Sequence, residues 1–537
     1  MKRSINCILL WCAVILCGLF SQGVSDALGN GAELVFRDSG RYRWVEADLL
    51  QGGRSMPTSV YPLSGEEFNT TVLREETPDN RGIAHRFIFS VNPSFCGFDM
   101  PYDKFDKFAP VDVLYLHDEI PPLLEVGGAV SIDNYFHASV VIDQTPGFDA
   151  MCGSDYYAPW RPSTILPSGD FPRESYVSLS LPHMRISMGR FKSGIGHGFF
   201  GNTFLNGKAP YYDQIQATLY GRKWKFFYMI GSSNTYLTPM EYQAQKNNPT
   251  GDAASAYADR MKMFAYHRLE YQPVDMLTVG FGEMNIIGGK FPDFNHINPV
   301  GIWHNTYSPA CSNVMGSADI SFVPLKGVLV YGEFTMDDLR TKDESEQSNP
   351  RAFAYQGGLK YVLPVPGDVK HVLGVECTHV DTWTYNRDEP YTTMYQRQVR
   401  RRVYIDIPLG FTDGGDLNHF GGYYTLIAKS GFELTVSYQH LDKGQVQLGL
   451  VNPTEPLPAA DPESAPIPWY SYSHDFNSAP SGIVEHHDIF EISAAYPIME
   501  HFDVTMKGHY SNIRNFQNQK GNDAYILMYY IGIGWRY

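Results

Sequence analysis

The last thirteen residues of the chain limit its fold more than any other stretch does. From Tyr525 to Tyr537 every second residue is apolar or aromatic, and the interleaved residues become small and then charged. A period of two predicts a β-strand with two different faces. Thirteen residues exceed the roughly 9–11 that a tilted strand needs to cross a bilayer. We therefore expect a membrane-spanning strand, with the edge strand of a soluble sandwich as the alternative.

The start of the chain agrees with export to a membrane. Lys2 and Arg3 precede a mostly apolar run at 5–20, which small and polar residues follow. This pattern is typical of a secretory signal peptide, and the apolar run is short for a spanning helix. We expect residues 1–25 to be removed. The four remaining cysteines are scattered and do not suggest a disulfide scaffold, although Cys96 and Cys152 could pair.

The connections between candidate strands set the fold class. After residue 173, tight turns alternate with long loops, the rhythm of a transmembrane antiparallel β-barrel. Fifteen strands fit between Glu174 and the end, and the alternating stretch Val403–Leu409 must then belong to a long loop. Three earlier candidates bring the total to about 18 strands (16–18) in an all-β barrel over residues 111–537. They are Val111–His117, Glu125–Ile132 and His137–Asp143.

Residues 26–110 are less regular, and we expect an N-terminal plug or periplasmic segment that may contribute strands. Tyr42–Leu50 and Ile83–Val91 could be strands, and Glu66–Glu76 could be a short helix capped by Ser64.

The charge balance limits the partners. The chain has 42 basic and 58 acidic residues, a formal charge of −16, which argues against nucleic acid as a partner. The final strand, which ends on Tyr537, resembles the closing strand of bacterial outer-membrane barrels. That resemblance implies the cell outer membrane as the location. Outer-membrane lipids, lipopolysaccharide and the barrel assembly machinery would then be partners.

A set of ordered segments resembles one family. A strand ending in Gly189-Arg190 leads through a glycine-rich loop to Pro210 and Asp213, and further segments follow in order. They are His267–Glu270, Asn298–Val300, Gly332–Leu339, Thr382–Tyr385 and Pro408–Gly410. Together they are similar to the Wzi-like capsule assembly family. The resemblance implies an 18-stranded barrel that helices plug on the periplasmic side. Such a barrel would act as a surface lectin that binds capsular polysaccharide or exopolysaccharide and helps to assemble or retain that layer.

The alternative function is a porin-type channel for small solutes, which the polar inner faces would also suit. The sequence shows no nucleophile motif and no metal-ligand spacing, so we expect neither an enzyme nor a cofactor.

Two groups of residues are candidates for polysaccharide binding. The first is a basic cluster, because the planar Arg side chain suits carboxylate and phosphate groups; a solvated loop is the alternative. It comprises Arg397, Arg400, Arg401 and Arg402. The second is a set of loop aromatics, on which sugar rings can stack; packing between loops is the alternative. It comprises Trp160, Trp383, Tyr385, Trp469 and Tyr470.

A third group lies at strand ends or on predicted inner faces. We expect it to form a charge network in the barrel interior, because buried charges must be paired. It comprises Arg190, Arg268, Glu270, Glu333 and Glu376. The loop around Gly194, Gly196, Gly198 and Gly201 precedes no regular helix, so we expect a compact loop over the barrel mouth rather than a phosphate site.

Overall fold

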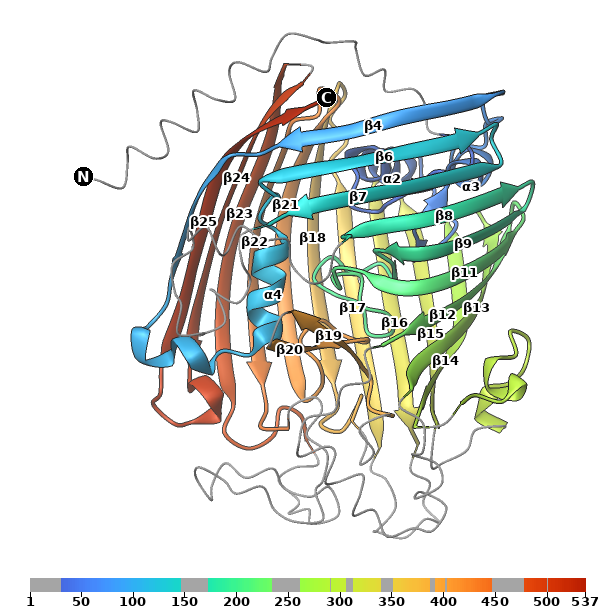
Figure 1. The fold of residues 1–537 in the computed structure, drawn as a ribbon. Helices are drawn as coiled ribbons and strands as arrows, with labels where there is room; N and C mark the ends of the chain where they lie inside the picture. Colours follow the sequence, from blue (N-terminus) through green and yellow to red (C-terminus); the bar gives the residue numbers. More distant parts are fainter. Residues whose placement is uncertain are drawn as a thin grey trace.

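The wall of the protein is a closed antiparallel β-barrel of 18 strand positions (Figure 1). The structure is a computed structural model. It describes residues 30–145, 172–233, 261–289, 291–305, 312–339, 351–386, 392–400, 403–446, 478–499 and 501–537. The predicted signal peptide at 1–25 lies outside these residues, as does Cys152, the suggested partner of Cys96.

The wall strands follow one another around the barrel in chain order. They are β4 (Ile83–Val91) with β5 (Ser94–Asp99), β6 (Leu124–Ile132), β7 (Phe136–Gln144), β8 (Glu174–Leu181), β9 (Met184–Phe191), β11 (Tyr212–Tyr220), β12 (Trp224–Ser232), β13 (Lys262–Val274), β14 (Leu277–Gly288), β15 (Ser312–Leu325), β16 (Val328–Asp338), β17 (Ala352–Val362), β18 (Val369–Val380), β21 (Leu417–Ala428), β22 (Glu433–Lys443), β23 (Glu485–Met499), β24 (Phe502–Arg514) and β25 (Ala524–Arg536).

Alternation along each strand separates a lipid-facing side from an inner side. In β25, Tyr529 and Ile531 are 42% and 52% exposed, whereas Ile526 and Met528 on the alternate positions are 4% and 0% exposed. A period of two places these two sets on opposite faces of the wall. The prediction of a membrane strand at the end of the chain is therefore confirmed. Among the described residues, no helix has the length and hydropathy to cross a membrane.

Two of the expected strands are helical in the structure. Val111–His117 lies in the helix α4 (Pro110–Asp118), with Pro110 in its first turn, and the first wall strand is formed by β4 and β5 instead. Pro suits the first turn of a helix because the N–H that it lacks would have no partner there. Tyr42–Leu50 is likewise helical, within α2 (Gly40–Gln51), where the Ser39 side chain accepts from the Tyr42 N–H. Such a cap favours a helix.

The short helix expected near Glu66 is present. Ser64 caps α3 (Gly65–Glu67), which continues into the helical turn η2 (Phe68–Leu73).

The expected position of Val403–Leu409 outside the wall is also confirmed. β20 (Val403–Pro408) pairs only with β19 (Tyr395–Arg400), and the two strands form a separate hairpin.

The N-terminal segment, residues 30–76, contacts the barrel at the end where the turns are short. The Leu50 carbonyl accepts from Gly327 in the β15–β16 turn at 2.6 Å, and Ser55 N donates to Asp275 in the β13–β14 turn at 2.8 Å. Helix α2 contacts β16, β17, β18 and β21. The segment therefore lies against the inner side of one half of the wall.

The largest apolar cluster of the described residues occupies the middle of the barrel. It brings together residues from α4, the loop after β9, the β19–β20 hairpin and the inner face of β25 (Figure 1). Its members include Leu114, Phe204, Ile407 and Met528, all at 0% exposure. The interior is thus packed like a protein core at this level.

Candidate functional site

The loop after β9, residues 192–211, turns into the barrel and is the centre of the site. Gly194 and Ile195 form the short strand β10, which pairs with β2 (Val60–Tyr61) of the N-terminal segment. Further along, Asn206 N donates to the Leu409 carbonyl at 2.7 Å. We call residues 192–211 the inner loop, because it joins the N-terminal segment to the chain beyond the β19–β20 hairpin.

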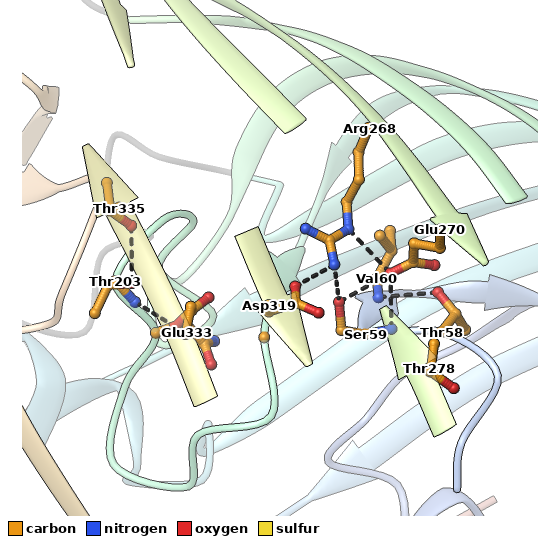
Figure 2. A network of polar contacts seen from close by, with 12 residues as sticks. Thr58, Ser59, Val60, Thr203, Arg268, Glu270, Thr278, Asp319, Glu333 and Thr335 are labelled. Atoms are coloured by element: carbon orange, nitrogen blue, oxygen red, sulfur yellow. Dashed lines mark hydrogen bonds and ion pairs between the residues drawn. The ribbon is translucent and has the colours of Figure 1, made fainter. Parts of the chain in front are cut away.

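Two wall carboxylates hold the inner loop by its backbone. Glu376 on β18 accepts from the N–H groups of Phe199 and Phe200, the latter at 3.0 Å. Glu333 on β16 accepts from Thr203 N at 2.8 Å (Figure 2). Both carboxylates are buried. A buried carboxylate without partners would be costly, so these N–H groups stabilise the acids while the acids fix the loop.

The glycines of the inner loop are required by close packing. A Cβ on Gly198 would lie 1.9 Å from the Gly201 carbonyl oxygen, and one on Gly201 would lie 2.6 Å from Thr412 Oγ1. No side chain fits at such distances. The expectation of a compact loop is met, although the loop packs within the barrel rather than only across its mouth.

An ion cluster ties the N-terminal segment to the wall. Arg268 on β13 contacts Glu270 at 3.0 Å, donates to Ser59 Oγ at 3.0 Å and pairs with Asp319 on β15 (Figure 2). Glu270 also accepts from Ser59 N at 3.0 Å. Gly280 makes room, because a Cβ there would overlap the Arg268 guanidinium. The group is fully desolvated, and removal of one member would leave a buried charge unpaired.

Helix α2 is fixed by a second set of ions. Lys360 contacts Glu46 at 2.9 Å, and Lys370 contacts Asp48 at 3.0 Å. Burial raises the pKa of Glu46, but the neighbouring Lys360 and Arg37 outweigh it and hold the pKa below its ordinary value. Glu46 therefore stays ionised and paired at neutral pH.

The predicted interior charges all lie on wall strands, and each has a polar partner: ion pairs for Arg190, Arg268 and Glu270, and backbone N–H groups for Glu333 and Glu376. Arg268, Glu270, Glu333 and Glu376 are buried in the contacts described above. Arg190 differs, because it makes a two-pronged contact with Asp213 at 2.7 and 2.8 Å and remains partly exposed. The sequence did not single out Asp319 or Ser59, because neither stands in a recognisable motif and both become partners only through the fold.

The basic cluster is only partly described. Arg397 is 3% exposed and makes a two-pronged contact with Asp406 across the β19–β20 hairpin, with both distances at 2.6 Å. It is therefore engaged within the protein and is not available to an acidic sugar. Arg400 ends β19, whereas Arg401 and Arg402 lie outside the described residues.

The aromatic set divides in the same way. Tyr385 is fully buried, its hydroxyl donates to the Thr203 carbonyl, and its N–H donates to Asp337 at 2.8 Å. A ring without exposed area cannot stack on a sugar, so Tyr385 is not a polysaccharide-binding residue. Its hydroxyl instead fixes the inner loop at Thr203. Trp383 is partly exposed. Trp160, Trp469 and Tyr470 lie outside the described residues.

The inner loop contains a buried histidine, His197, whose protonation would place a charge inside the packed interior. His197 is 7% exposed, and Arg37 donates to its backbone carbonyl at 2.8 Å. Burial lowers the pKa of His197 to about 4, and nearby Arg37 acts in the same direction. The folded protein therefore holds the imidazole neutral, whereas the unfolded chain binds a proton near pH 6.5.

We expect the His197 contribution to stability to be complete above pH 6.5 and to be lost as the pH falls toward 4, because the unfolded state then binds more protons. The measurement is the denaturation midpoint of the purified barrel at pH 7.5 and pH 4.5, for wild type and His197→Gln. The variant should lose less stability on acidification. Equal losses would show that His197 does not contribute to the acid sensitivity.

Comparison with known proteins places the chain. The family model for capsule assembly protein Wzi matches residues 173–526, more than half of the chain. A similar solved structure is described as Wzi, an outer membrane protein involved in group 1 capsule assembly in Escherichia coli and a carbohydrate-binding β-barrel. The two share 14% identity with a TM-score of 0.56, over 94% of this chain and 99% of that chain.

Two other solved structures are less similar. Pseudomonas aeruginosa OprD aligns at 8% identity and a TM-score of 0.41, over 85% of this chain and 97% of that chain. Acinetobacter baumannii OccAB1 aligns at 8% identity and a TM-score of 0.41, over 84% and 96%. No curated protein matches the chain by sequence. The family match and the closed wall place the protein in the outer membrane. The chain belongs to the Wzi capsule assembly family.

Proposed function

We propose that the barrel binds capsular polysaccharide or exopolysaccharide through its long-loop end and so helps to assemble or retain that layer on the cell surface. Membership of the capsule assembly family supports this, as does the carbohydrate binding stated for the similar Escherichia coli barrel. The proposal needs no catalytic step and no cofactor. The wall acts as a rigid support for the loops that meet the glycan.

The filled interior is the observation that carries the proposal. The N-terminal segment, the inner loop, α4 and the β19–β20 hairpin meet in one buried cluster, and the buried Lys360–Glu46 ion pair fixes the N-terminal segment to the wall. A solute channel needs a continuous water-filled path, which such packing opposes. The porin alternative is therefore the less favoured function. On this proposal residues 30–76 serve as the plug at the short-turn end, and that end faces the periplasm.

The binding residues are also proposed. Arg400 ends β19, and Arg401 and Arg402 connect it in sequence to β20. The start of this hairpin is fixed to the rest of the protein, because Lys262 donates to the Thr393 carbonyl at 2.8 Å and Gln396 donates to that of Tyr211 at 2.9 Å. Because the hairpin is already fixed, the arginines at its turn would lose little conformational entropy on binding an acidic glycan. Trp383, Trp160, Trp469 and Tyr470 would supply rings for stacking.

The test is a deletion strain stained for surface polysaccharide and complemented with variants. Wild type should restore the attached layer, whereas Arg400→Gln/Arg401→Gln/Arg402→Gln should restore less, and the purified variant should bind acidic glycan less well at low salt. A matched control removes three exposed positive charges at the opposite end: Lys223→Gln/Lys326→Gln/Lys429→Gln. A normal layer in the deletion strain would refute the proposed function, and equal binding by the two triple variants would remove the arginines from the site.

A further inference from the structure

A cluster of histidine and aspartate lies on the outer side of the wall, apart from the inner loop. His440 and Asp442 stand two residues apart on β22, and His486 and Asp488 stand two residues apart on β23. The register places His440 opposite Asp488 and Asp442 opposite His486. Two residues apart on a strand means one face, so all four side chains share a face of the sheet.

That face is the outward one. Val436 on β22 and Phe490 on β23 share it and are 43% and 52% exposed, whereas Leu441, on the other face, belongs to the central cluster. The four polar residues lie beyond these apolar side chains, toward the long-loop end of both strands. They are partly exposed, each side chain at between 26% and 33%.

Three of these residues direct ligand atoms at one point. Asp442 Oδ1 lies 3.1 Å from His440 Nε2 and 2.5 Å from His486 Nδ1. One ligand atom from each of His440, Asp442 and His486 lies within 4.8 Å of the other two. Ligands of a tetrahedral zinc ion are about 3.3 Å apart, so small side-chain rotations suffice to bring all three onto one ion.

The other ring nitrogen of His440 shows why a cation suits this point. His440 Nδ1 lies 2.9 Å from Asp488 Oδ1. If Nδ1–H donates to Asp488, the neutral ring turns the lone pair of Nε2 toward the Asp442 carboxylate. Two electron-rich atoms then face each other unless a proton or a metal ion lies between them.

Asp488 is itself held in place. The Tyr438 hydroxyl donates to Asp488 Oδ1 at 2.9 Å, and Arg514 from β24 lies 3.7 Å from its second oxygen. A carboxylate that orients a ligating imidazole through its far nitrogen is the usual outer support of a metal–histidine bond. Three neighbouring strands therefore contribute to one arrangement.

We propose that His440, Asp442 and His486 form a binding site for a late first-row transition metal ion such as Zn²⁺, with Asp488 as the positioning residue of His440. Imidazole ligands suit Zn²⁺, Ni²⁺ and Cu²⁺, whereas Mg²⁺ and Ca²⁺ prefer oxygen ligands only. Three protein ligands leave a fourth position for water or for a carboxylate or phosphate oxygen from outside the protein. The bound ion would join β22 to β23 where the strands leave the membrane.

The test is calorimetric titration with ZnCl₂ of the full barrel, purified in detergent with a histidine-free tag and cleared of metal by a chelator. Wild type should bind one more equivalent than His440→Gln/His486→Gln. Asp488→Asn should keep that equivalent with an affinity about 10- to 100-fold weaker. The matched control is His371→Gln, because His371 is on β18 with its ring 2.7 Å from the Tyr424 hydroxyl, outside the cluster. It should bind as wild type does.

Two outcomes would overturn the proposal. One is the same stoichiometry and affinity in wild type and His440→Gln/His486→Gln. The other is tighter binding of CaCl₂ than of ZnCl₂ at this site. If the double variant does not fold, zinc-edge X-ray absorption of the loaded wild type decides, because the site requires two imidazole nitrogens in the zinc shell and a spectrum without them excludes it.

Discussion

Removing residues 195–206 should turn a barrel that blocks ions into one that conducts them. The excised piece includes Phe204 and Leu205, both fully buried in the central cluster, and Thr203, which Glu333 and Tyr385 hold. Without it, α4 and the β19–β20 hairpin lose their partner in the middle of the barrel, and water can enter between them. We expect no steady current from wild type in planar bilayers and stepwise channel openings from the variant.

The cut is placed where the chain returns upon itself. A Cβ built on Gly194 would lie 2.6 Å from the Gly207 Cα, so the two glycines are neighbours at the base of the inner loop. Linking Gly194 directly to Gly207 should leave the register of β9 with β11 unchanged, because the two ends of this compact loop already lie close together. The wall should therefore close as before.

A second variant separates blockage from strain. Replacing residues 195–206 by twelve Gly and Ser residues keeps the chain length but removes the side chains and anchors. Both variants should conduct if the inner loop fills the barrel. Conductance in the excised form alone would assign the effect to strain at the new joint, and silence in both would show that the remaining segments suffice to close the interior.

Arg268→Met should destabilise the barrel by about 3–5 kcal/mol, the usual result of removing one partner from a buried ion group. Glu270 and Asp319 would remain as desolvated carboxylates without their cation, and Ser59 would lose a donor. The measurement is the free energy of unfolding in denaturant, followed by the change in electrophoretic mobility between folded and unfolded barrel.

Two comparisons make this prediction specific. Arg190→Met breaks the partly exposed contact with Asp213, so it should cost only about 0–1 kcal/mol. Arg268→Met/Glu270→Gln/Asp319→Asn removes all three charges together and should recover most of the stability, because a neutral interior needs no counter-ion. If the triple variant is as unstable as the single one, the shape of the side chains and not their charge determines the loss.

The wall could be derived from the sequence because each strand carries its own signal. In β24 and β25 the alternation of apolar and polar residues is local, and a tight turn such as Gly221-Arg222 marks its own position between β11 and β12. The rule that all short turns lie at one end then excluded Val403–Leu409 from the wall, and the structure agrees.

The interior could not be derived in the same way. Val111–His117 contains apolar residues at spacings that fit a strand or a helix, and Pro110 was the better guide. The central cluster also depends on contacts between segments far apart in the chain. Examples are Glu376 with Phe200 and Tyr385 with Thr203. The local sequence pattern identifies Glu376 and Tyr385 as charged or aromatic residues. It does not identify their partners, because these lie far away in the chain.

The closing seam of the wall is divided between two strands. The last strand, β25, pairs with β5 along Leu527–Gly532 and then with β4 only at Trp535 and Arg536. From within, Glu119, just after α4, pairs with Lys507 on the neighbouring β24. The strand pair that closes the wall is therefore supported from the interior by an ion pair to the helix that precedes β6.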